Sequence, residues 1–334
     1  MRIALVASRN GHGHARRLLH LGFGLEHFGA KVTIFCSDTS LPLLKLESAS
    51  FERSSVSLEL ATESFETGFD GPYSDRSQST VAKKSKSEMH RKFANFEFVI
   101  GDNVLWPAEY SSTFIFHGHF LWIDYYRETK SRRIDCLQEK QEADLRNLSL
   151  TKKFLMNEIF EIPSQYLRGN NVIKMPLMQY VASRKQRYGF HEPRDSTVWL
   201  SQGLTESTSE EKIKRIIRIV DSLGLKIQQK ETFNLGNFPI PNVVIGRPGL
   251  GTIRDIMNYG VDFVPIEFRN DFELKHNVEV LVKQDLIQSD GTLDETILKV
   301  VENSRSLKLK AFWQANSLPC IDYSALCMKE FSSC

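Results

Sequence analysis

The first 37 residues constrain the fold more than any other part of the chain. Residues 2–8 (RIALVAS) form a short apolar run of β-forming character that ends in a glycine-bearing turn. Over residues 14–29, apolar side chains recur at helical spacing from Leu18 to Phe28. Residues 30–37 (AKVTIFCS) predict a second strand. A strand, a loop, a helix and a strand in this order open a doubly wound α/β domain, so we predict a Rossmann-like fold.

The same pattern returns in the second half of the chain. Residues 196–204 (STVWLSQGL) predict a strand and a glycine turn, and residues 209–224 predict an amphipathic helix. Residues 242–252 (NVVIGRPGLGT) predict another strand that runs into a glycine turn. The chain is therefore expected to hold two Rossmann-like domains, with a charged linker between them. The predicted boundaries are residues 1–177 for the first domain, 178–194 for the linker, 195–318 for the second domain and 319–334 for a C-terminal tail that can pack back on the first domain.

Composition narrows the class of protein. A chain of 334 residues is long enough for two domains, and 41% apolar with 25% charged residues is typical of a soluble globular protein. A net charge of +2 disfavours a dedicated nucleic-acid binder. The five cysteines contain no C-x-x-C pair, which favours reduced thiols in the cytoplasm. No apolar window reaches the roughly 18–20 residues of a membrane span. We expect a cytoplasmic protein, and peripheral contact with the inner face of a membrane stays open.

The loop after the first strand is rich in glycine, histidine and arginine (residues 8–17, SRNGHGHARR). Gly11 and Gly13 let the backbone bend tightly and let its N–H groups approach an anion at the start of the following helix. The loop is neither a G-x-G-x-x-G motif, because Arg16 holds the third glycine position, nor a Walker A loop. On its own it is equally typical of a plain strand-to-helix turn.

A second glycine loop covers residues 246–256 (GRPGLGTIRDI). Gly249 and Gly251 lie at the start of a helix that Thr252 can cap, and Asp255 lies one turn further along. If phosphates occupied the helix start, Asp255 would lie near the ribose hydroxyl groups. The alternatives are a packing turn and an aspartate that faces solvent.

Polar residues also end two strands of the first half, namely Asp102 and the pair His117 and His119. We expect them at the same edge of the sheet as His14. Together with His12 these histidines invite a metal site. Histidines two residues apart without a carboxylate cluster seldom form a closed site, and the chain has no Asp-x-Asp, so we expect no metal cofactor.

Taken together, the two loops resemble those of a known superfamily. The chain resembles the GT-B glycosyltransferases in two segments. The first is residues 8–14 followed by Arg16 and Arg17. The second, some 230 residues later, is residues 243–266 (VVIGRPGLGTIRDIMNYGVDFVPI). The similarity is greatest to the lipid-linked N-acetylglucosaminyltransferase of peptidoglycan synthesis and to UDP-glycosyltransferases. It implies two Rossmann-like domains facing a central cleft, with the acceptor on the N-terminal domain and the nucleotide-sugar on the C-terminal one.

The resemblance implies metal-independent transfer of a sugar from a nucleotide-sugar donor, with UDP-sugars favoured, to a hydroxyl group of a glycan, a lipid-linked or a small-molecule acceptor. His14 maps onto the general base, the role for which imidazole suits neutral pH, and Asp102 is the candidate to orient it. The implied acceptor-side residues are Gly11, Gly13, His117 and His119. The implied donor-side residues are Gly203, Arg247, Gly249, Gly251, Thr252, Asp255, Glu273 and Asn277.

Two other functions stay open. Nucleotide-sugar hydrolases of the pseudaminic-acid pathway share the loop pattern G-x-G-H-x-x-R and attack the donor with water. The other is a GT-B-like binding or scaffold protein without catalysis. It stays open because Glu273 and Leu274 replace the family's usual glutamine or Asp-Gln pair. A basic stretch is either an anion-binding surface for the acceptor or a solvated helix face; its residues are Lys83, Lys84, Lys86, Arg91 and Lys92.

Overall fold

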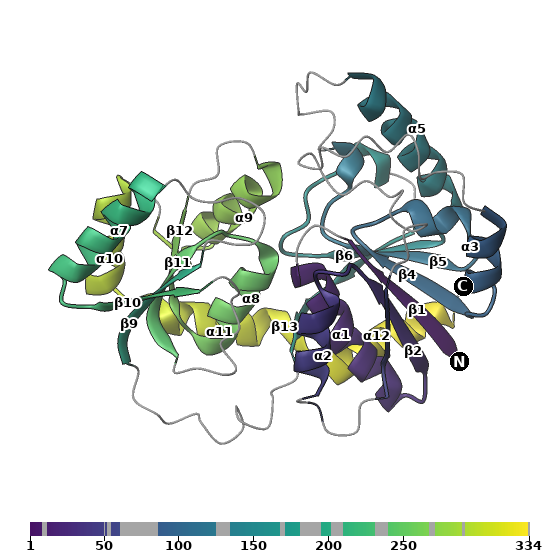
Figure 1. Cartoon of the computed structure of the whole chain (residues 1–334), viewed down its shortest axis with the longest axis horizontal. Coiled ribbons are helices and arrows are strands. Elements are labelled where there is room, and N and C mark those ends of the chain that lie inside the picture. Colours follow the sequence, from purple (N-terminus) through teal and green to yellow (C-terminus); the bar gives the residue numbers. More distant parts are fainter. Residues whose placement is uncertain are drawn as a thin grey trace. The chain divides into compact units, whose positions relative to one another are not determined.

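The computed structural model divides into two compact units, unit 1 with Met1–Val181 and Leu318–Cys334, and unit 2 with Ala182–Ser317 (Figure 1). It describes residues 1–8, 12–49, 51, 55–60, 86–124, 134–167, 171–180, 195–201, 210–230, 240–266, 271–288 and 291–332. The predicted linker begins too early, because β8 (Leu177–Gln179) is a strand of unit 1 that pairs with β13 (Ser317–Pro319).

Unit 1 is built on a seven-stranded parallel sheet with the order β3-β2-β1-β4-β5-β6-β7. The chain therefore starts in the middle of the sheet, builds outward in one direction and then returns to build in the other. The strands are β1 (Arg2–Ala7), β2 (Lys31–Cys36), β3 (Ser57–Leu60), β4 (Phe98–Asp102), β5 (Phe114–Gly118), β6 (Lys153–Asn157) and β7 (Val172–Met175).

Helices cover both faces of this sheet. Along β1, Ile3 and Leu5 join one apolar cluster and Ala4 and Val6 join another, so both faces are buried. The first cluster includes side chains of α1 (His12–His27), α2 (Leu41–Ser48) and α12 (Cys320–Phe331). The second includes side chains of α3 (Lys86–Phe93), α5 (Ile134–Leu150), η3 (Trp106–Glu109) and η4 (Gln165–Leu167).

The helix predicted after the first strand is α1. Leu18, Leu21 and Leu25 are fully buried, as their helical spacing predicts. Phe28 does not continue this row, because the helix ends at His27 and Phe28 is 43% exposed. The turn that follows uses Gly29 at a positive φ of 78°.

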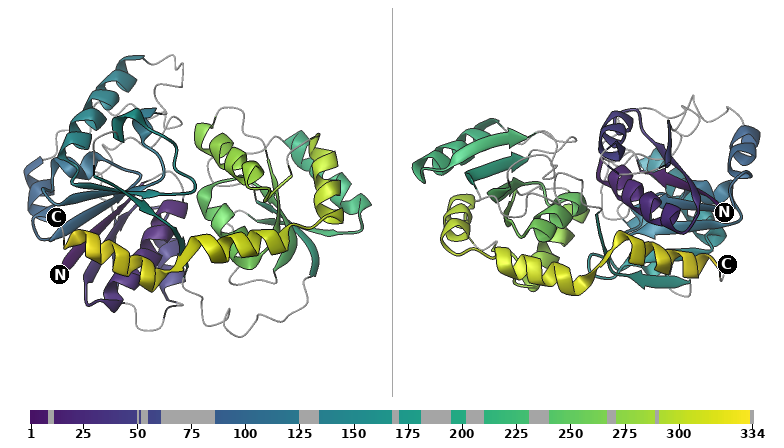
Figure 2. Two further views of the ribbon diagram at one scale, coloured as in Figure 1. Left: turned by 180° about the vertical axis from the view of Figure 1, so that it is seen from behind. Right: turned by 90° about the horizontal axis from the view of Figure 1, so that it is seen from below.

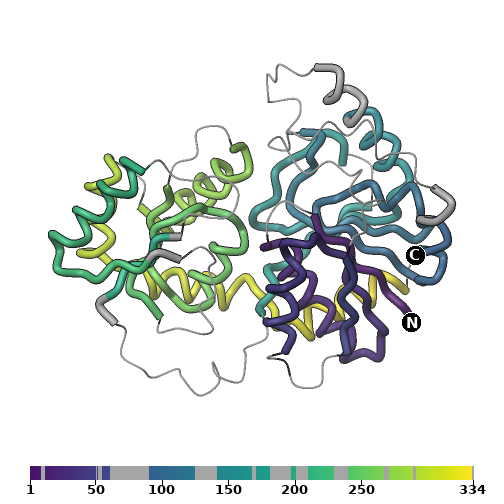
Figure 3. The backbone as a smooth tube through the Cα atoms, in the orientation of Figure 1, coloured from purple at the N-terminus to yellow at the C-terminus, as the bar shows by residue number. Residues whose placement is uncertain are grey.

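The C-terminal helix α12 packs against α1 within unit 1 (Figure 2). Gly24 permits this close packing, because a Cβ atom there would lie 2.6 Å from the carbonyl oxygen of Cys320. Both chain ends consequently lie on unit 1, as the path of the chain in Figure 3 shows.

Unit 2 has a four-stranded parallel sheet with the order β10-β9-β11-β12. One face is covered by α7 and α10, whose Ile216, Val220 and Ile297 pack on Val198 and Ile245 of the sheet. Helix α8 lies on the opposite side (Figure 2) and packs against α11. The elements are β9 (Asp195–Ser201), α7 (Glu210–Ser222), β10 (Lys226–Lys230), β11 (Pro241–Gly246), α8 (Leu250–Tyr259), β12 (Asp262–Pro265), α9 (Phe272–Lys283), α10 (Leu293–Glu302) and α11 (Ser306–Asn316).

Each sheet has one point at which the strand order reverses, between β1 and β4 in unit 1 and between β9 and β11 in unit 2. Ligands of doubly wound sheets bind beyond the carboxyl ends of the strands at such a point. The candidate sites of the two units are therefore expected at the ends of these strands. Among the helices that the structure describes, none has the length and apolar character needed to cross a membrane.

Candidate functional site

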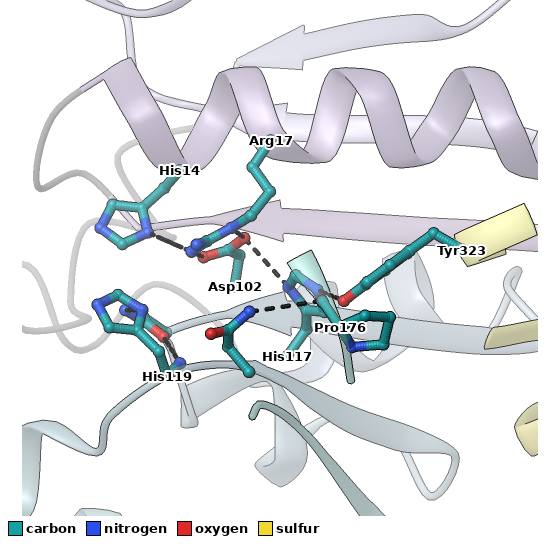
Figure 4. A network of polar contacts seen from close by, with 9 residues as sticks. His14, Arg17, Asp102, His117, His119, Pro176 and Tyr323 are labelled. Atoms are coloured by element: carbon teal, nitrogen blue, oxygen red, sulfur yellow. Dashed lines mark hydrogen bonds and ion pairs between the residues drawn. The ribbon is translucent and has the colours of Figure 1, made fainter. Parts of the chain in front are cut away.

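Asp102 is the centre of a buried polar network at the carboxyl end of β4 (Figure 4). Its side chain is fully buried. The Nδ1 atom of His14 lies 2.8 Å from its Oδ1 atom, and Arg17 binds both carboxylate oxygens through Nε and Nη2. Because His14 and Arg17 lie one turn apart on α1, the start of this helix is held on the end of the neighbouring strand.

A second histidine binds the other side of the same carboxylate. The Nδ1 atom of His117, at the end of β5, lies 3.3 Å from Oδ2 of Asp102. Its Nε2 atom lies 2.7 Å from the hydroxyl oxygen of Tyr323 on α12. Asp102 therefore joins α1, β5 and, through His117, the C-terminal helix.

The ion pair at this site stays charged. Burial alone would raise the pKa of Asp102, but the charge of Arg17 and hydrogen bonds from His117 and His14 hold that pKa well below its usual value. Burial opposes the charge of Arg17 too, yet Asp102 raises the pKa of the guanidinium above its usual value. A carboxylate and a guanidinium thus neutralise each other inside unit 1.

This charge state assigns the tautomer of His14. A carboxylate only accepts hydrogen bonds, so Nδ1 of His14 carries the proton and donates a hydrogen bond to Asp102. The Nη2 atom of Arg17 lies 3.1 Å from the same Nδ1, but it too is a donor, so this contact is no hydrogen bond in that tautomer. Nε2 is left as the ring nitrogen that can take up a proton.

Asn103 explains the unusual His-Gly-His end of β5. Its backbone has a positive φ of 53°, and its Oδ1 atom accepts a hydrogen bond from the backbone N–H of His119 at 3.2 Å. Its Nδ2 atom lies 3.4 Å from Nδ1 of the His119 ring. A Cβ atom on Gly118 would lie 1.9 Å from Oδ1 of Asn103, so only glycine fits between the two histidines. Sequence reasoning missed Asn103, although an asparagine directly after a strand is a signal for this backbone conformation.

The arginines at positions 16 and 17 serve different networks. The Nε atom of Arg16 donates to Glu47 of α2 at 2.8 Å, and Nε2 of His20 lies 3.1 Å from the same carboxylate oxygen. His20 also stacks on Tyr180 with 4.1 Å between the ring centroids. Burial would raise the pKa of Glu47, but Arg16 and His20 lower it to about 2. This second network, also missed from the sequence, fixes α1 to α2.

The four histidines considered for a metal do not gather around one point that a metal ion could occupy. His14 and His117 bind Asp102, and His119 contacts Asn103. His12 is partly buried, which lowers its pKa to about 4, and its Nδ1 atom has no hydrogen-bond partner among the described residues. Within the described part of the chain, no three side chains of histidine, cysteine, aspartate or glutamate are grouped for a metal ion. Gly13 is exposed, and Gly11 lies outside the described residues.

In unit 2, the start of α8 is open. Gly249 is the N-cap residue in an extended conformation, and no side chain of the described residues caps the helix there. A Cβ atom at Gly249 would meet no described atom within 4 Å. The prediction that Thr252 caps this helix is wrong, because Thr252 is its third residue. The first N–H groups of α8 can therefore bind an anion at the positive end of the helix dipole.

Side chains of α9 hold the loop before this helix. The Nη2 atom of Arg247 donates to Asp271 at 2.8 Å, and Asp271 also caps α9 by accepting from the backbone N–H of Leu274. The buried Asn277 donates through Nδ2 to the carbonyl oxygen of Pro248 at 3.0 Å. Asp271 thus ties Arg247 to the start of α9, and its role was missed from the sequence.

The other donor-side residues are placed as follows. Gly251 and Glu273 are half-buried in the first turns of α8 and α9. Asp255 is 3% exposed, so the alternative of an aspartate that faces solvent is wrong. Gly203 and the lysines at 83 and 84 lie outside the described residues.

Comparison with known proteins gives a match in structure and none in sequence. No protein-family model and no curated protein matches the chain. The spinosyn forosaminyltransferase SpnP matches with a TM-score of 0.63 and 13% identity over 99% of both chains. The glycosyltransferase SsfS6 of Streptomyces sp. SF2575 has a TM-score of 0.60 and 12% identity, covering 98% of this chain and 99% of its own. The chain has the GT-B fold.

A plant enzyme shows how widely this fold extends. UGT89C1 of Arabidopsis thaliana, solved with UDP-L-rhamnose, matches with a TM-score of 0.58 and 10% identity, covering 94% of this chain and 93% of its own. The predicted GT-B architecture of two Rossmann-like domains is thereby confirmed. At such low identity the likeness establishes the fold.

Proposed function

We propose that the chain is a glycosyltransferase that moves a sugar from a nucleotide-sugar donor to a hydroxyl group, with His14 as the general base. The observation that carries this proposal is the 2.8 Å contact between Nδ1 of His14 and Oδ1 of Asp102. It lies where the strand order of unit 1 reverses, which is where doubly wound sheets bind ligands. The glycosyltransferase fold supports the same class of reaction.

In the proposed step, the acceptor hydroxyl gives its proton to Nε2 of His14 while its oxygen attacks the anomeric carbon of the donor. The bond from that carbon to the diphosphate breaks, and the diphosphate leaves with the electron pair. Asp102 orients the ring for this proton transfer. Arg17 keeps Asp102 ionised and in place.

Unit 2 is the proposed binding site for the diphosphate of the donor. The start of α8, which no described side chain caps, offers backbone N–H groups, and the guanidinium of Arg247, held by Asp271, adds further N–H donors. These groups stabilise the leaving charge, so the proposal requires no metal ion. Among the solved neighbours, UGT89C1 was solved with UDP-L-rhamnose and SsfS6 with thymidine diphosphate, so donors with either base belong in the test.

A donor panel with mass-spectrometric detection of product tests the proposal. With the best donor and acceptor, His14→Ala should lower kcat by about 10²–10⁴-fold, the usual contribution of general-base catalysis. His27→Ala, at the far end of the same helix, is the control and should leave kcat unchanged. Near-normal turnover of His14→Ala would overturn the base assignment, and loss of activity in EDTA would overturn the metal-independent mechanism.

The same panel separates the alternative functions. Consumption of donor with water as the only acceptor would identify a nucleotide-sugar hydrolase. If no UDP, GDP, TDP or CMP compound raises the Tm of the protein, a binding or scaffold role without catalysis replaces the proposal.

A further inference from the structure

Tyr323 joins the last helix of the chain to the polar network around Asp102. Its hydroxyl oxygen lies 2.7 Å from Nε2 of His117, a residue 206 positions earlier in the sequence. Both side chains are only 3% exposed, and their rings meet edge to face at a centroid distance of 6.0 Å. Figure 4 shows Tyr323 and His14 reaching the same carboxylate from different elements, Tyr323 through His117 and His14 directly.

The direction of each hydrogen bond follows from the charges. Asp102 is ionised and can only accept hydrogen bonds, so Nδ1 of His117 carries a proton and donates a hydrogen bond to it. Arg17 already neutralises Asp102, and a second buried cation would be uncompensated, so the His117 ring is neutral. Its Nε2 atom is then an acceptor, and the hydroxyl of Tyr323 donates to it. Tyr323 therefore holds the His117 ring in the orientation in which Nδ1 binds Asp102.

The position of His117 affects His14 through Asp102, because each histidine binds a different oxygen of that carboxylate. His14 takes Oδ1 and His117 takes Oδ2, while Arg17 spans both. Without the Tyr323 hydroxyl on Nε2, the His117 ring would be held at Nδ1 alone and could rotate away from Oδ2. Oδ2 would lose one of its two donors, and Asp102, then held by Arg17 and His14 alone, could shift relative to the His14 ring.

We propose that Tyr323 is a positioning residue for the transfer step, acting through His117 and Asp102 on His14. The inference rests on the proposed function of His14 as the base. It makes the C-terminal helix a part of the active site, although its sequence carries no motif of the site.

Other contacts hold α12 in place, so the hydroxyl of Tyr323 is separable from the docking of its helix. Ser324 donates through Oγ to the carbonyl oxygen of Leu21 at 3.3 Å. Lys153 of β6 lies 3.0 Å from the carboxylate of Glu330 and donates to its backbone carbonyl at 2.7 Å. Ser324→Ala is therefore a matched control for Tyr323→Phe, because each variant removes one buried hydroxyl from the same helix.

Kinetics and NMR on the full chain test the proposal. Tyr323→Phe should lower kcat by about tenfold, the lower end of the effect of leaving a buried hydrogen-bonding group without its partner, and leave the KM of donor and acceptor unchanged. Ser324→Ala should leave all three constants unchanged. In protein labelled with ¹⁵N-histidine, Tyr323→Phe should move the ring-nitrogen signals of His117 and His14, and Ser324→Ala should not.

Three results would overturn the proposal. The first is a wild-type His117 with its proton on Nε2, and the second is a Tyr323→Phe variant with unchanged His14 signals. The third is an equal loss of kcat in both variants, which would show that only helix docking matters. If Tyr323→Phe does not fold, 3-fluorotyrosine at position 323 keeps the hydroxyl as a stronger donor and should still move the His117 signals. The NMR result needs no turnover, so it decides the positioning role even if the proposed function fails.

Discussion

The two units use the same type of sheet, but they differ at the point where the strand order reverses. Side chains occupy this point in unit 1, and backbone lines it in unit 2. In unit 1 this point is filled with side chains, and the Arg17–Asp102 pair and two histidines leave no oxygen of the carboxylate without a donor. In unit 2 the equivalent point is a glycine turn before a helix that no described side chain caps. A proton-transfer site needs one fixed side-chain geometry, whereas backbone N–H groups can bind an anion only where side chains leave room.

Two glycines show the difference most directly. Gly118 in unit 1 is required because Asn103 occupies the place of a side chain. Gly249 in unit 2 has an ordinary φ of −69°, and no atom of the described residues lies within 4 Å of the place of its missing Cβ. Gly118 allows Asn103 to pack against the end of β5, and Gly249 leaves room for a ligand before the first N–H groups of α8.

The ion pairs of the two units also differ, because Arg17–Asp102 is buried and Arg247–Asp271 is partly exposed. The largest expected effect on stability comes from breaking the buried pair. Asp102→Asn should lower the free energy of unfolding of unit 1 by about 3–5 kcal/mol, because it leaves Arg17 charged and buried without a counter-charge. Urea denaturation with hydrogen exchange read at β4 measures this loss. A change below about 1 kcal/mol would mean that unit 1 does not depend on its buried charges.

Acid should weaken unit 1 through the Glu47 network. Because the pKa of Glu47 is about 2 in the folded chain and 4.5 in a model peptide, the unfolded chain binds the proton first. The stabilisation is complete above pH 4.5 and is lost as the pH falls to about 2, a loss of about 3 kcal/mol. Comparing Glu47→Gln with the wild type between pH 6 and pH 2 measures it. Parallel pH profiles of the two proteins would contradict this role of Glu47.

Adding one methyl group at Gly118 should destabilise unit 1 by about 2 kcal/mol, a typical cost of overpacking a buried site. The new Cβ atom would displace Asn103 and with it the hydrogen bond to the backbone of His119. Thermal unfolding gives the size of the effect, and the ring signals of His119 in NMR show where it arises. A Gly118→Ala variant as stable as the wild type would mean that Asn103 can move away at no cost.

The ion pair of unit 2 should matter less. Asp271→Ala removes the cap of α9 and the partner of Arg247, whose side chain is 21% exposed and can reach water. The expected loss is about 1–2 kcal/mol, most of it from the cap. Hydrogen exchange at α9 measures it. A loss as large as that of Asp102→Asn would remove the contrast between the two pairs.

The smallest effect on stability is expected at Gly249. Gly249→Ala should change the free energy of unfolding by less than about 1 kcal/mol, because the backbone is relaxed and the site is open. The methyl group would nevertheless occupy the space before α8, so the Tm increase produced by UDP or TDP should shrink. Gly118→Ala should leave that increase unchanged. Equal nucleotide shifts in the wild type and Gly249→Ala would show that the start of α8 is not the donor site.

Much of the fold was predictable because its signals are local. The spacing of Leu18, Leu21 and Leu25 predicts the buried face of α1, and the apolar run before it predicts β1. The glycine loops also mark the ends of β1 and β11, so His14 and Gly249 could be selected as site residues. Phe28 and Thr252 were misjudged because one residue decides where a helix ends or begins, and short-range patterns do not determine that residue.

By itself, the sequence determined the two α/β halves and the strands and helices that carry their glycine loops, and its family resemblance selected Asp102 as a partner for His14. Only the tertiary structure decided that Arg17 and His117 share that carboxylate and that Tyr323 completes the network. The physical reason is distance along the chain. Periodicity shows which face of an element is buried, but strand order and the packing of α12 on α1 decide which donors meet which acceptor.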